Sequence, residues 1–207
     1  MTSEQEATTG RGPYAQGVAA QQRILREAAE LFGRHGFRGA SLDEIAKRSG
    51  ITKQGLLHHF PNKKSLLISV LKYRDEADLA SWPGTPDSLV GSAVLDAWDR
   101  TVERNAEQAG LVRLSHVLCA ESAGEDHPAR EFFLDHFKLG YDSLVGAFEA
   151  GVEAGELRPD FDYGIIARQV IAMLEGLENQ WLVDPANVDI VALFHAYTAQ
   201  LRTIISA

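Results

Sequence analysis

The sequence has one cysteine, Cys119, among its 207 residues, so the chain cannot form an intrachain disulfide. It also lacks any run of about 18 apolar residues, the length that a membrane-spanning helix requires. The first 17 residues are polar and contain glycine, so they lack the apolar core of a signal peptide and are predicted to form a disordered tail. Together these absences favour a cytoplasmic protein.

The motifs of common catalytic and metal sites are missing as well. No HExxH, CxxC or phosphate-binding-loop pattern occurs, and adjacent His58 and His59 would point about 100° apart on a helix, which prevents chelation. His116 and Cys119 would share a helix face, as a base and a nucleophile do. Because no third orienting group accompanies them, a buried thiol beside a pocket or core histidine is the favoured interpretation. We expect no enzyme, no metal and no cofactor.

Strand-like alternation of apolar and polar residues is also absent over any useful length, and the sequence has no internal repeat. Apolar residues instead recur at helical spacing along most of the chain. The breaker cluster at residues 81–88 predicts a joint between modules, after a helix over about residues 63–80. The pattern predicts an all-α fold, in which an N-terminal three-helix head joins a larger helical body.

Charge is distributed unevenly along the chain. The net charge of −9 by itself argues against nucleic-acid binding. However, residues 1–72 hold 11 Lys and Arg against 6 Asp and Glu, a net charge of +5, whereas residues 73–207 hold 9 against 23, a net charge of −14. A basic head on an acidic body is expected of a DNA-binding module joined to another module. We therefore expect a tail at 1–17, a head at 18–72 and a body at 73–207.

The head has the turn signals of a helix-turn-helix. Ser41 and Glu44 have the spacing of a capping box at the start of a short helix, and Thr52 is placed to cap the next helix, which ends near His59. Leu56 would face inward, which leaves Lys53, Gln54, Gly55, Leu57 and His58 facing outward. Gly55 lowers helix stability by about 1 kcal/mol relative to Ala. It would either allow close approach to a sugar-phosphate edge or relieve a tight helix crossing.

Two lysines occupy an unfavourable position at the start of the next helix. Asn62 is the expected N-cap, so Lys63 and Lys64 would occupy the first turn, where the helix dipole favours negative charge. A DNA phosphate bound at this N-terminus would make the two cations favourable. The alternative is that both lysines simply point into solvent.

At these spacings the chain resembles the tetracycline-repressor (TetR) family. The resemblance rests on an ordered set of residues: Arg23-Ile24-Leu25, Ala28-Ala29, Leu31-Phe32, Gly36, Ile45-Ala46, Gly50-Ile51, Leu56, His59-Phe60, Lys63 and Leu66-Leu67. The family commonly has Tyr at the position of Leu57, where its hydroxyl approaches a phosphate, so that contact is lost here or replaced by His58. The residues expected to contact DNA are Ser41, Thr52, Lys53, Gln54, Gly55, Leu57, His58, Lys63 and Lys64.

The resemblance also implies a ligand cavity and a dimer seam in the body. The helices expected to enclose the cavity carry Trp98, His116, Cys119, Phe133, Phe137, Tyr141, Gln169, Met173 and Trp181. Aromatic walls with a few polar groups suit a small organic molecule, although plain core packing would explain any one aromatic residue. The helix over residues 163–182 is apolar on every side, which indicates burial on every side. We expect it to form the dimer interface with the last helix, through Ile166, Val170, Ile171, Leu174, Leu177, Phe194, Tyr197 and Leu201.

The resulting hypothesis is a homodimeric transcriptional regulator, a repressor that binds a palindromic operator in double-stranded DNA and is released by a small organic molecule. An activator or a ligand-independent regulator of the same fold is the first alternative. A small helical enzyme with an accessory helix-turn-helix, and a helical adaptor whose basic head binds an acidic protein, are the others.

Overall fold

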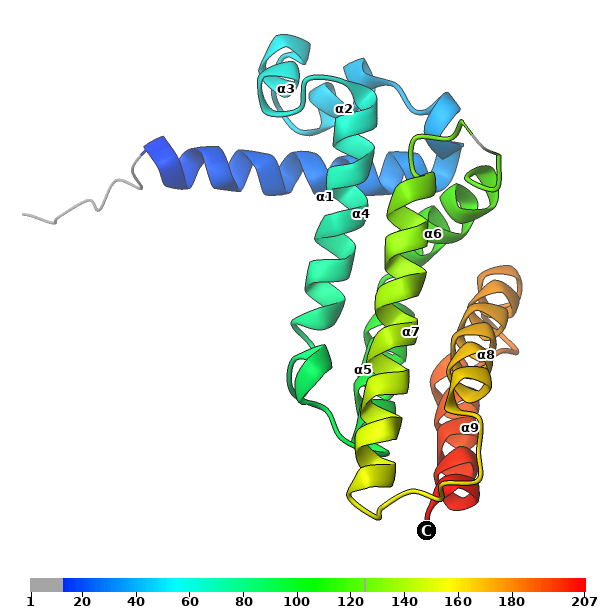
Figure 1. Cartoon of the computed structure of the whole chain (residues 1–207). Helices are drawn as coiled ribbons and strands as arrows, with labels where there is room; N and C mark the ends of the chain where they lie inside the picture. Colours follow the sequence, from blue (N-terminus) through cyan, green and yellow to red (C-terminus); the bar gives the residue numbers. More distant parts are fainter. Residues whose placement is uncertain (1–12, 125) are drawn as a thin grey trace, which may run out of the picture.

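The computed structural model describes residues 13–124 and 126–207. In these residues the regular elements are helices, as predicted (Figure 1). They are α1 (Pro13–Gly39), α2 (Leu42–Arg48), α3 (Lys53–His59), α4 (Lys63–Leu79), the short 3-10 helix η1 (Pro86–Ser88), α5 (Ala93–Ala106), α6 (Ala109–Glu121), α7 (Arg130–Glu153), α8 (Tyr163–Val183) and α9 (Ile190–Ile205). No helix in the described part of the chain is long and apolar enough to cross a membrane.

The predicted tail at residues 1–17 is too long by five residues. Helix α1 begins at Pro13, which is favourable in a first helical turn because that turn does not use its backbone N–H groups. Residues 1–12 lie outside the described part of the chain.

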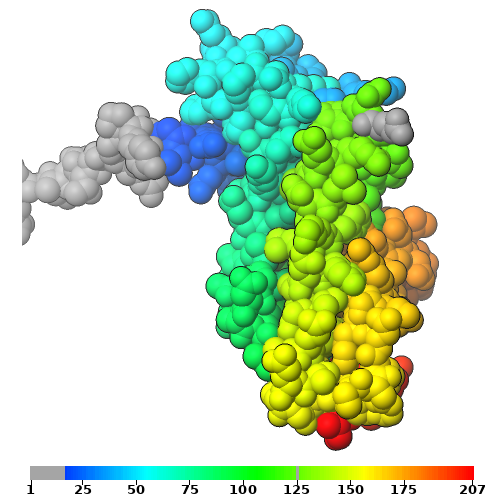
Figure 2. All heavy atoms as spheres, viewed as in Figure 1, coloured from blue at the N-terminus to red at the C-terminus, as the bar shows by residue number. Residues whose placement is uncertain are grey.

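The molecule has a small head and an elongated body (Figure 1). Helices α2 and α3 lie at one end, and α4 runs from them along the body beside α7. Helix α1 crosses α4 and packs against α6, while α5 packs against α9 and α8 lies between α7 and α9. Figure 2 shows the cyan residues of α2 and α3 forming the end of the molecule opposite the C-terminus.

Local signals explain the turns of the head. Gly36 has a φ of 66° and bends α1 near its end, while Gly50, with a φ of 68°, follows α2; both lie in the left-handed region that favours glycine. The Ser41 hydroxyl accepts a hydrogen bond from the N–H of Asp43 at 3.2 Å, not from Glu44 as a capping box requires. Asn62 instead forms a capping box with Ser65 at the start of α4.

The core of the head extends into the body. Ile24, Phe32, Ile45, Leu56 and Leu66 are fully buried in one apolar cluster. The same cluster includes four buried residues of the body: Leu114 and Leu118 of α6, Ala129, and Phe133 of α7. Helix α4 also runs without a break across residues 72 and 73. The head is therefore packed firmly on the body and is not joined to it by a flexible linker.

The residues predicted for the dimer interface lie mostly in the core of the one chain. Val170 and Phe194 have no exposed surface, and the others in the buried set are 7–9% exposed: Ile166, Ile171, Leu174, Leu177 and Leu201. The reason is that α8 packs against α6, α7 and α9 of its own chain. Of the predicted residues, only Tyr197 remains partly exposed.

Gly33 allows α1 and α6 to cross closely. A Cβ added at Gly33 would lie 2.6 Å from the backbone oxygen of Gly110 and 3.4 Å from the backbone nitrogen of Leu114. A backbone oxygen cannot move away as a flexible side chain does. The interface between α1 and α6, which joins the head to the body, therefore depends on this glycine.

We expect Gly33→Ala to lower the free energy of unfolding by about 1–3 kcal/mol, because the added methyl group overpacks the crossing. The matched control is Gly146→Ala in α7, where an added Cβ meets nothing within 4 Å. Since Ala is the better helix former, that change should raise stability by about 0.5–1 kcal/mol. Urea unfolding at one protein concentration measures both. Equal stabilisation by the two variants would show that the crossing is not tight.

Candidate DNA-binding surface and body cavity

Helix α3 presents a polar face at the end of the head. Leu56 is fully buried and holds the helix on the head core, while Gln54 and His58, one turn apart, are both exposed. The Thr52 hydroxyl caps the helix by accepting a hydrogen bond from the N–H of Gly55 at 3.0 Å. The cap fixes the direction in which α3 leaves the preceding turn, and therefore fixes where Gln54 and His58 point.

The space around Gly55 distinguishes between its two predicted roles. A Cβ added there would meet the Thr52 hydroxyl at 3.3 Å and the Ile51 Cβ at 3.9 Å, both within the same turn of the head. Among the described residues, no neighbouring helix lies within 4 Å of that position. Relief of a helix crossing therefore does not explain Gly55, whereas close approach by another molecule remains consistent with it.

The lysines of the head differ in their surroundings. Lys53 Nζ lies 2.9 Å from an Asp43 carboxylate oxygen of α2. Lys63 Nζ donates a hydrogen bond to the Arg38 carbonyl at 3.2 Å and lies 5.0 Å from the centre of the Phe37 ring, and burial lowers the pKa of this ammonium group. Lys64 is exposed. Lys63 therefore ties α4 to the end of α1, and Lys64 is the lysine of this turn that faces solvent.

The body contains a cavity of about 100 Å³ beneath the head, lined by residues of α4 to α8. Five of the predicted ligand residues line it: Trp98, His116, Cys119, Phe133 and Phe137. Ile171 and Leu174, which were predicted for the dimer interface, also line the cavity. The structure therefore brings this part of the predicted set together around one cavity.

Four predicted ligand residues lie elsewhere. Tyr141 stacks with the Arg168 guanidinium, 4.3 Å from its ring centre, on the outer side of α8. Gln169 and Met173 are exposed, and Trp181 is partly buried against the body core. The error comes from the rotation of α8, because its cavity-facing residues are Ile171, Leu174, Glu175 and Glu178.

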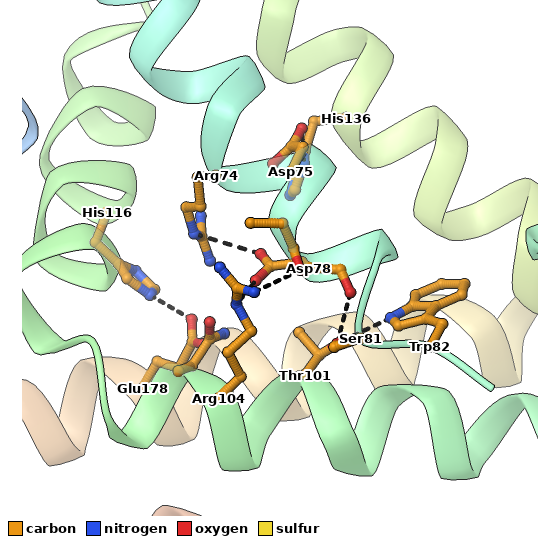
Figure 3. Close-up of polar contacts among 12 residues, drawn as sticks. Arg74, Asp75, Asp78, Ser81, Trp82, Thr101, Arg104, His116, His136 and Glu178 are labelled. Carbon is orange, nitrogen blue, oxygen red and sulfur yellow. Dashed lines mark hydrogen bonds and ion pairs between the residues drawn. The ribbon is translucent and has the colours of Figure 1, made fainter. Parts of the chain in front are cut away.

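Sequence reasoning missed a buried ion cluster from α4. Asp78 lies 2.9 Å from the Nε of Arg104 on α5 and 3.7 Å from the Nε of Arg74 one turn earlier on α4 (Figure 3). Arg104 also donates a hydrogen bond to the Ala77 carbonyl. Burial raises the pKa of the Asp78 carboxyl, although Arg74 and Arg104 oppose the shift. The i, i+4 spacing of Arg74 and Asp78 was the available signal, but the sequence does not show the partner on α5.

His116 is a polar residue in a mostly apolar helix, and its ring has a carboxylate partner. Its Nε2 lies 2.8 Å from one carboxylate oxygen of Glu178 (Figure 3). The Asn105 side chain donates a hydrogen bond to the other oxygen at 2.6 Å. Glu178 is only 3% exposed, so these two contacts replace its water. Across the cavity, His136 of α7 pairs with Asp75 of α4 at 3.0 Å. The indole N–H of Trp82, in the segment after α4, donates to the Thr101 hydroxyl at 2.8 Å.

Two titratable groups in the cavity wall remain without a strong partner. Burial, and secondarily Glu175, raise the pKa of the Cys119 thiol, which keeps it protonated and argues against a nucleophile. Burial also raises the pKa of the Glu175 carboxyl; nearby Glu178 raises it further, while His116, His136 and Arg74 oppose the shift. Within the described residues, no hydrogen bond or ion pair joins the Glu175 carboxylate to another side chain.

The chain is similar in sequence and fold to known proteins. Residues 24–70 match the family model described as bacterial regulatory proteins of the tetR family. The transcriptional regulator RutR of Escherichia coli O157:H7 is 39% identical over 163 residues, covering 77% of this chain and 74% of RutR. The transcriptional repressor SCO4008 of Streptomyces coelicolor is 37% identical over 169 residues, 81% and 80% of the two chains. Among solved structures, SmeT of Stenotrophomonas maltophilia in complex with triclosan superposes with a TM-score of 0.77 at 20% identity, over 91% and 92% of the two chains.

Removing the Glu175 charge should stabilise the protein in a pH-dependent way. The raised pKa means that the folded state favours the protonated carboxyl, so stability falls as the pH rises from the ordinary value of 4.5 through the raised value. Glu175→Gln should therefore be more stable than the native chain at pH 8, and the difference should disappear as the pH falls toward 4.5. The matched control, Glu149→Gln, changes an exposed carboxylate of α7. Thermal unfolding from pH 5 to 8 measures this, and an advantage independent of pH would contradict it.

Proposed function

The chain belongs to the tetR family of bacterial regulatory proteins, and we propose that it is a repressor that binds a palindromic operator as a homodimer and is released by a small organic molecule in the body cavity. It is a transcriptional regulator with a DNA-binding helix-turn-helix. The proposal that a ligand releases the repressor is supported by one observation: α4 contributes to both the DNA-binding head and the body cavity. Its first half, with Leu66 and Leu67, belongs to the head core, and its second half, with Arg74 and Asp78, lines the cavity.

The charge distribution supports DNA binding by the head alone. Residues 1–72 carry a net charge of +5 and the remainder carries −14, so phosphates attract one end of the molecule and repel the other. Gln54 and His58 are exposed on the same face of α3, a short helix of the kind that enters a major groove. In this arrangement Lys64 contacts the phosphate backbone, while Gln54 reads a base edge.

An apolar surface on α8 and α9 supports the homodimer. Ile165 and Met173 of α8 are 57% and 38% exposed, and Leu193 and Ile204 of α9 are 46% and 53% exposed. Ile165 and Ile204 line one surface pocket between α8 and α9, and exposed large apolar side chains are typical of an interaction site. A second copy, related by a two-fold axis, would cover this α8–α9 face and place two heads on two half-sites. The dimer interface proposed here uses these exposed residues in place of the buried ones.

The position of the cavity supports release by a ligand. A molecule that binds there contacts α4, and a change in the tilt of α4 moves the head with it, because both share a packed core. In a dimer, such a movement changes the distance between the two heads. The ligand then favours a separation that no longer matches successive major grooves.

The proposal is tested with DNA that flanks the gene. Fluorescence anisotropy with labelled fragments should find one palindromic fragment bound tightly by two subunits, and a reporter fused to that fragment should be repressed. Increased transcription would identify an activator of the same fold. Binding without sequence preference at physiological salt would contradict the proposal.

Gln54→Ala should relax the preference at one base pair of each half-site by roughly 1–3 kcal/mol, as expected for loss of a bidentate base contact. The comparison variant is Lys64→Ala, which should weaken operator and random DNA alike and reduce the salt slope by about 0.9, since a phosphate contact carries no sequence information. Anisotropy with a set of single-base operator variants distinguishes them. If Gln54→Ala weakened the affinity for all operator variants equally, Gln54 would not contact a base.

Met173→Asp combined with Leu193→Asp should give a folded monomer with greatly reduced operator affinity, because the α8–α9 face must desolvate these charges on association and the tether between two heads is lost. The matched control is Leu134→Asp, which places the same charge at a residue of α7 that is 59% exposed. Sedimentation at micromolar concentration measures both variants. A native chain that sediments as a monomer would exclude the interface.

A further inference from the structure

The cavity and its immediate surroundings hold more acidic than basic groups. Four carboxylates face two guanidinium groups: Asp75, Asp78, Glu175 and Glu178 against Arg74 and Arg104. The carboxylates therefore outnumber the guanidinium groups in this cluster. His136 lies close to Asp75 and His116 close to Glu178, so each histidine has its own carboxylate. Both guanidinium groups lie beside Asp78.

Of these four carboxylates, Glu175 has no partner in this pairing. Asp75, Asp78 and Glu178 each have a charged or polar partner within 3.0 Å, whereas Glu175 has none among the described residues. Glu175 is half-buried. It lies three residues before Glu178 on α8, and both residues line the cavity. A carboxylate withdrawn from water without a partner is unfavourable, and a bound cation would compensate for it.

The remaining walls are aromatic. Trp98, which is 8% exposed, and Phe133, which is 4% exposed, line the cavity together with Phe137. Aromatic faces attract cations through their quadrupole and provide apolar contact for alkyl groups. The indole N–H of Trp98 is buried and has no hydrogen-bond partner in the described part of the chain.

We propose that the cavity binds a small organic cation, with its charged centre against the Glu175 carboxylate and its alkyl groups against Trp98 and Phe137. This inference rests on the proposed function, because it names the chemical class of the effector. An organic anion is disfavoured although Arg74 is 93% buried in the wall, because Asp75, Asp78, Glu175 and Glu178 would repel it. Arg74 already faces Asp78 at 3.7 Å.

The volume limits the size of the cation. The cavity measures about 100 Å³, whereas an apolar cavity of about 150 Å³ accommodates benzene. A compact cation of about seven non-hydrogen atoms is slightly larger than benzene, so its binding requires the cavity walls to move outward. A quaternary ammonium group suits such a site because it has no N–H group that would need a hydrogen-bond acceptor. The single carboxylate of Glu175 balances its charge.

The test uses three probes of nearly the same shape and different charge. Choline is the cation, 3,3-dimethylbutan-1-ol is its uncharged isostere, and 3,3-dimethylbutanoate is the anion. Isothermal titration of the full-length protein at pH 7.5 should find choline bound about tenfold more tightly than the alcohol, the effect expected of one partly desolvated cation–π contact and its counter-ion. The anion should bind most weakly. Equal affinity for choline and the alcohol, a preference for the anion, or binding of none of the three at 20 mM would overturn the inference.

Glu175→Gln should remove the preference for choline over the alcohol while leaving the affinity for the alcohol within about twofold, since the change keeps the size of the side chain and removes its charge. Glu149→Gln, at an exposed position of α7, should leave all three affinities unchanged. A choline preference that persists in Glu175→Gln would assign the charge recognition to another group and contradict the proposal.

The inference and the proposed function fail in different measurements. If choline binds with the expected preference but does not change operator affinity, the cavity recognises cations and the effector role is wrong. If the native chain binds its operator as a dimer but shows no charge preference among the probes, the proposed regulatory function is supported and the cation proposal is wrong.

Discussion

The carboxylate of Asp78 is the point on which the arrangement of the body depends. It is withdrawn from water near the end of α4 and is stabilised by two guanidinium groups, one from its own helix and one from α5. Burial raises the pKa of this carboxyl even beside two cations, so desolvation outweighs the attraction. Removing one partner of such a buried cluster is strongly unfavourable. The cluster therefore fixes the position of α4 relative to α5 (Figure 3), and its residues Arg74 and Asp78 line the cavity.

This constraint gives α4 its place in the molecule. One continuous helix packs Leu66, Leu67 and Val70 into the head core and presents Arg74 and Asp78 to the cavity. On the other side, α6 supplies Leu114 and Leu118 to the head core and His116 to the cavity. Helices α4 and α6 thus each contact both sites, and Phe133 of α7 also belongs to both. A molecule bound between them acts on groups that are already part of the structure of the head, so no separate transmitting segment is required.

Much of the head could be predicted from the sequence because its determinants are local. Caps at Thr52 and Asn62, a left-handed glycine at Gly50 and apolar residues at helical spacing act within a few residues of one another. The cavity was predicted only in part, because pairs such as Asp78 with Arg104 join residues that are distant in sequence. The residues predicted for the dimer interface lie in the core of their own chain for a related reason. An apolar stripe shows that a helix face is buried, but not whether its own chain or a second copy buries it, and α8 uses Val170 and Leu174 within one chain.

The central claim is that α4 transmits the state of the cavity to the DNA-binding head. The most direct test is the operator affinity of Arg104→Gln, a variant that releases α4 from α5 and touches no part of the head, compared with Arg100→Gln at an exposed position of the same helix. The account predicts that Arg104→Gln weakens operator binding by about 2- to 30-fold, the range of couplings of 0.5–2 kcal/mol, with an unchanged salt slope because no phosphate contact is lost. A folded Arg104→Gln protein that binds its operator as tightly as Arg100→Gln and the native chain would contradict the account.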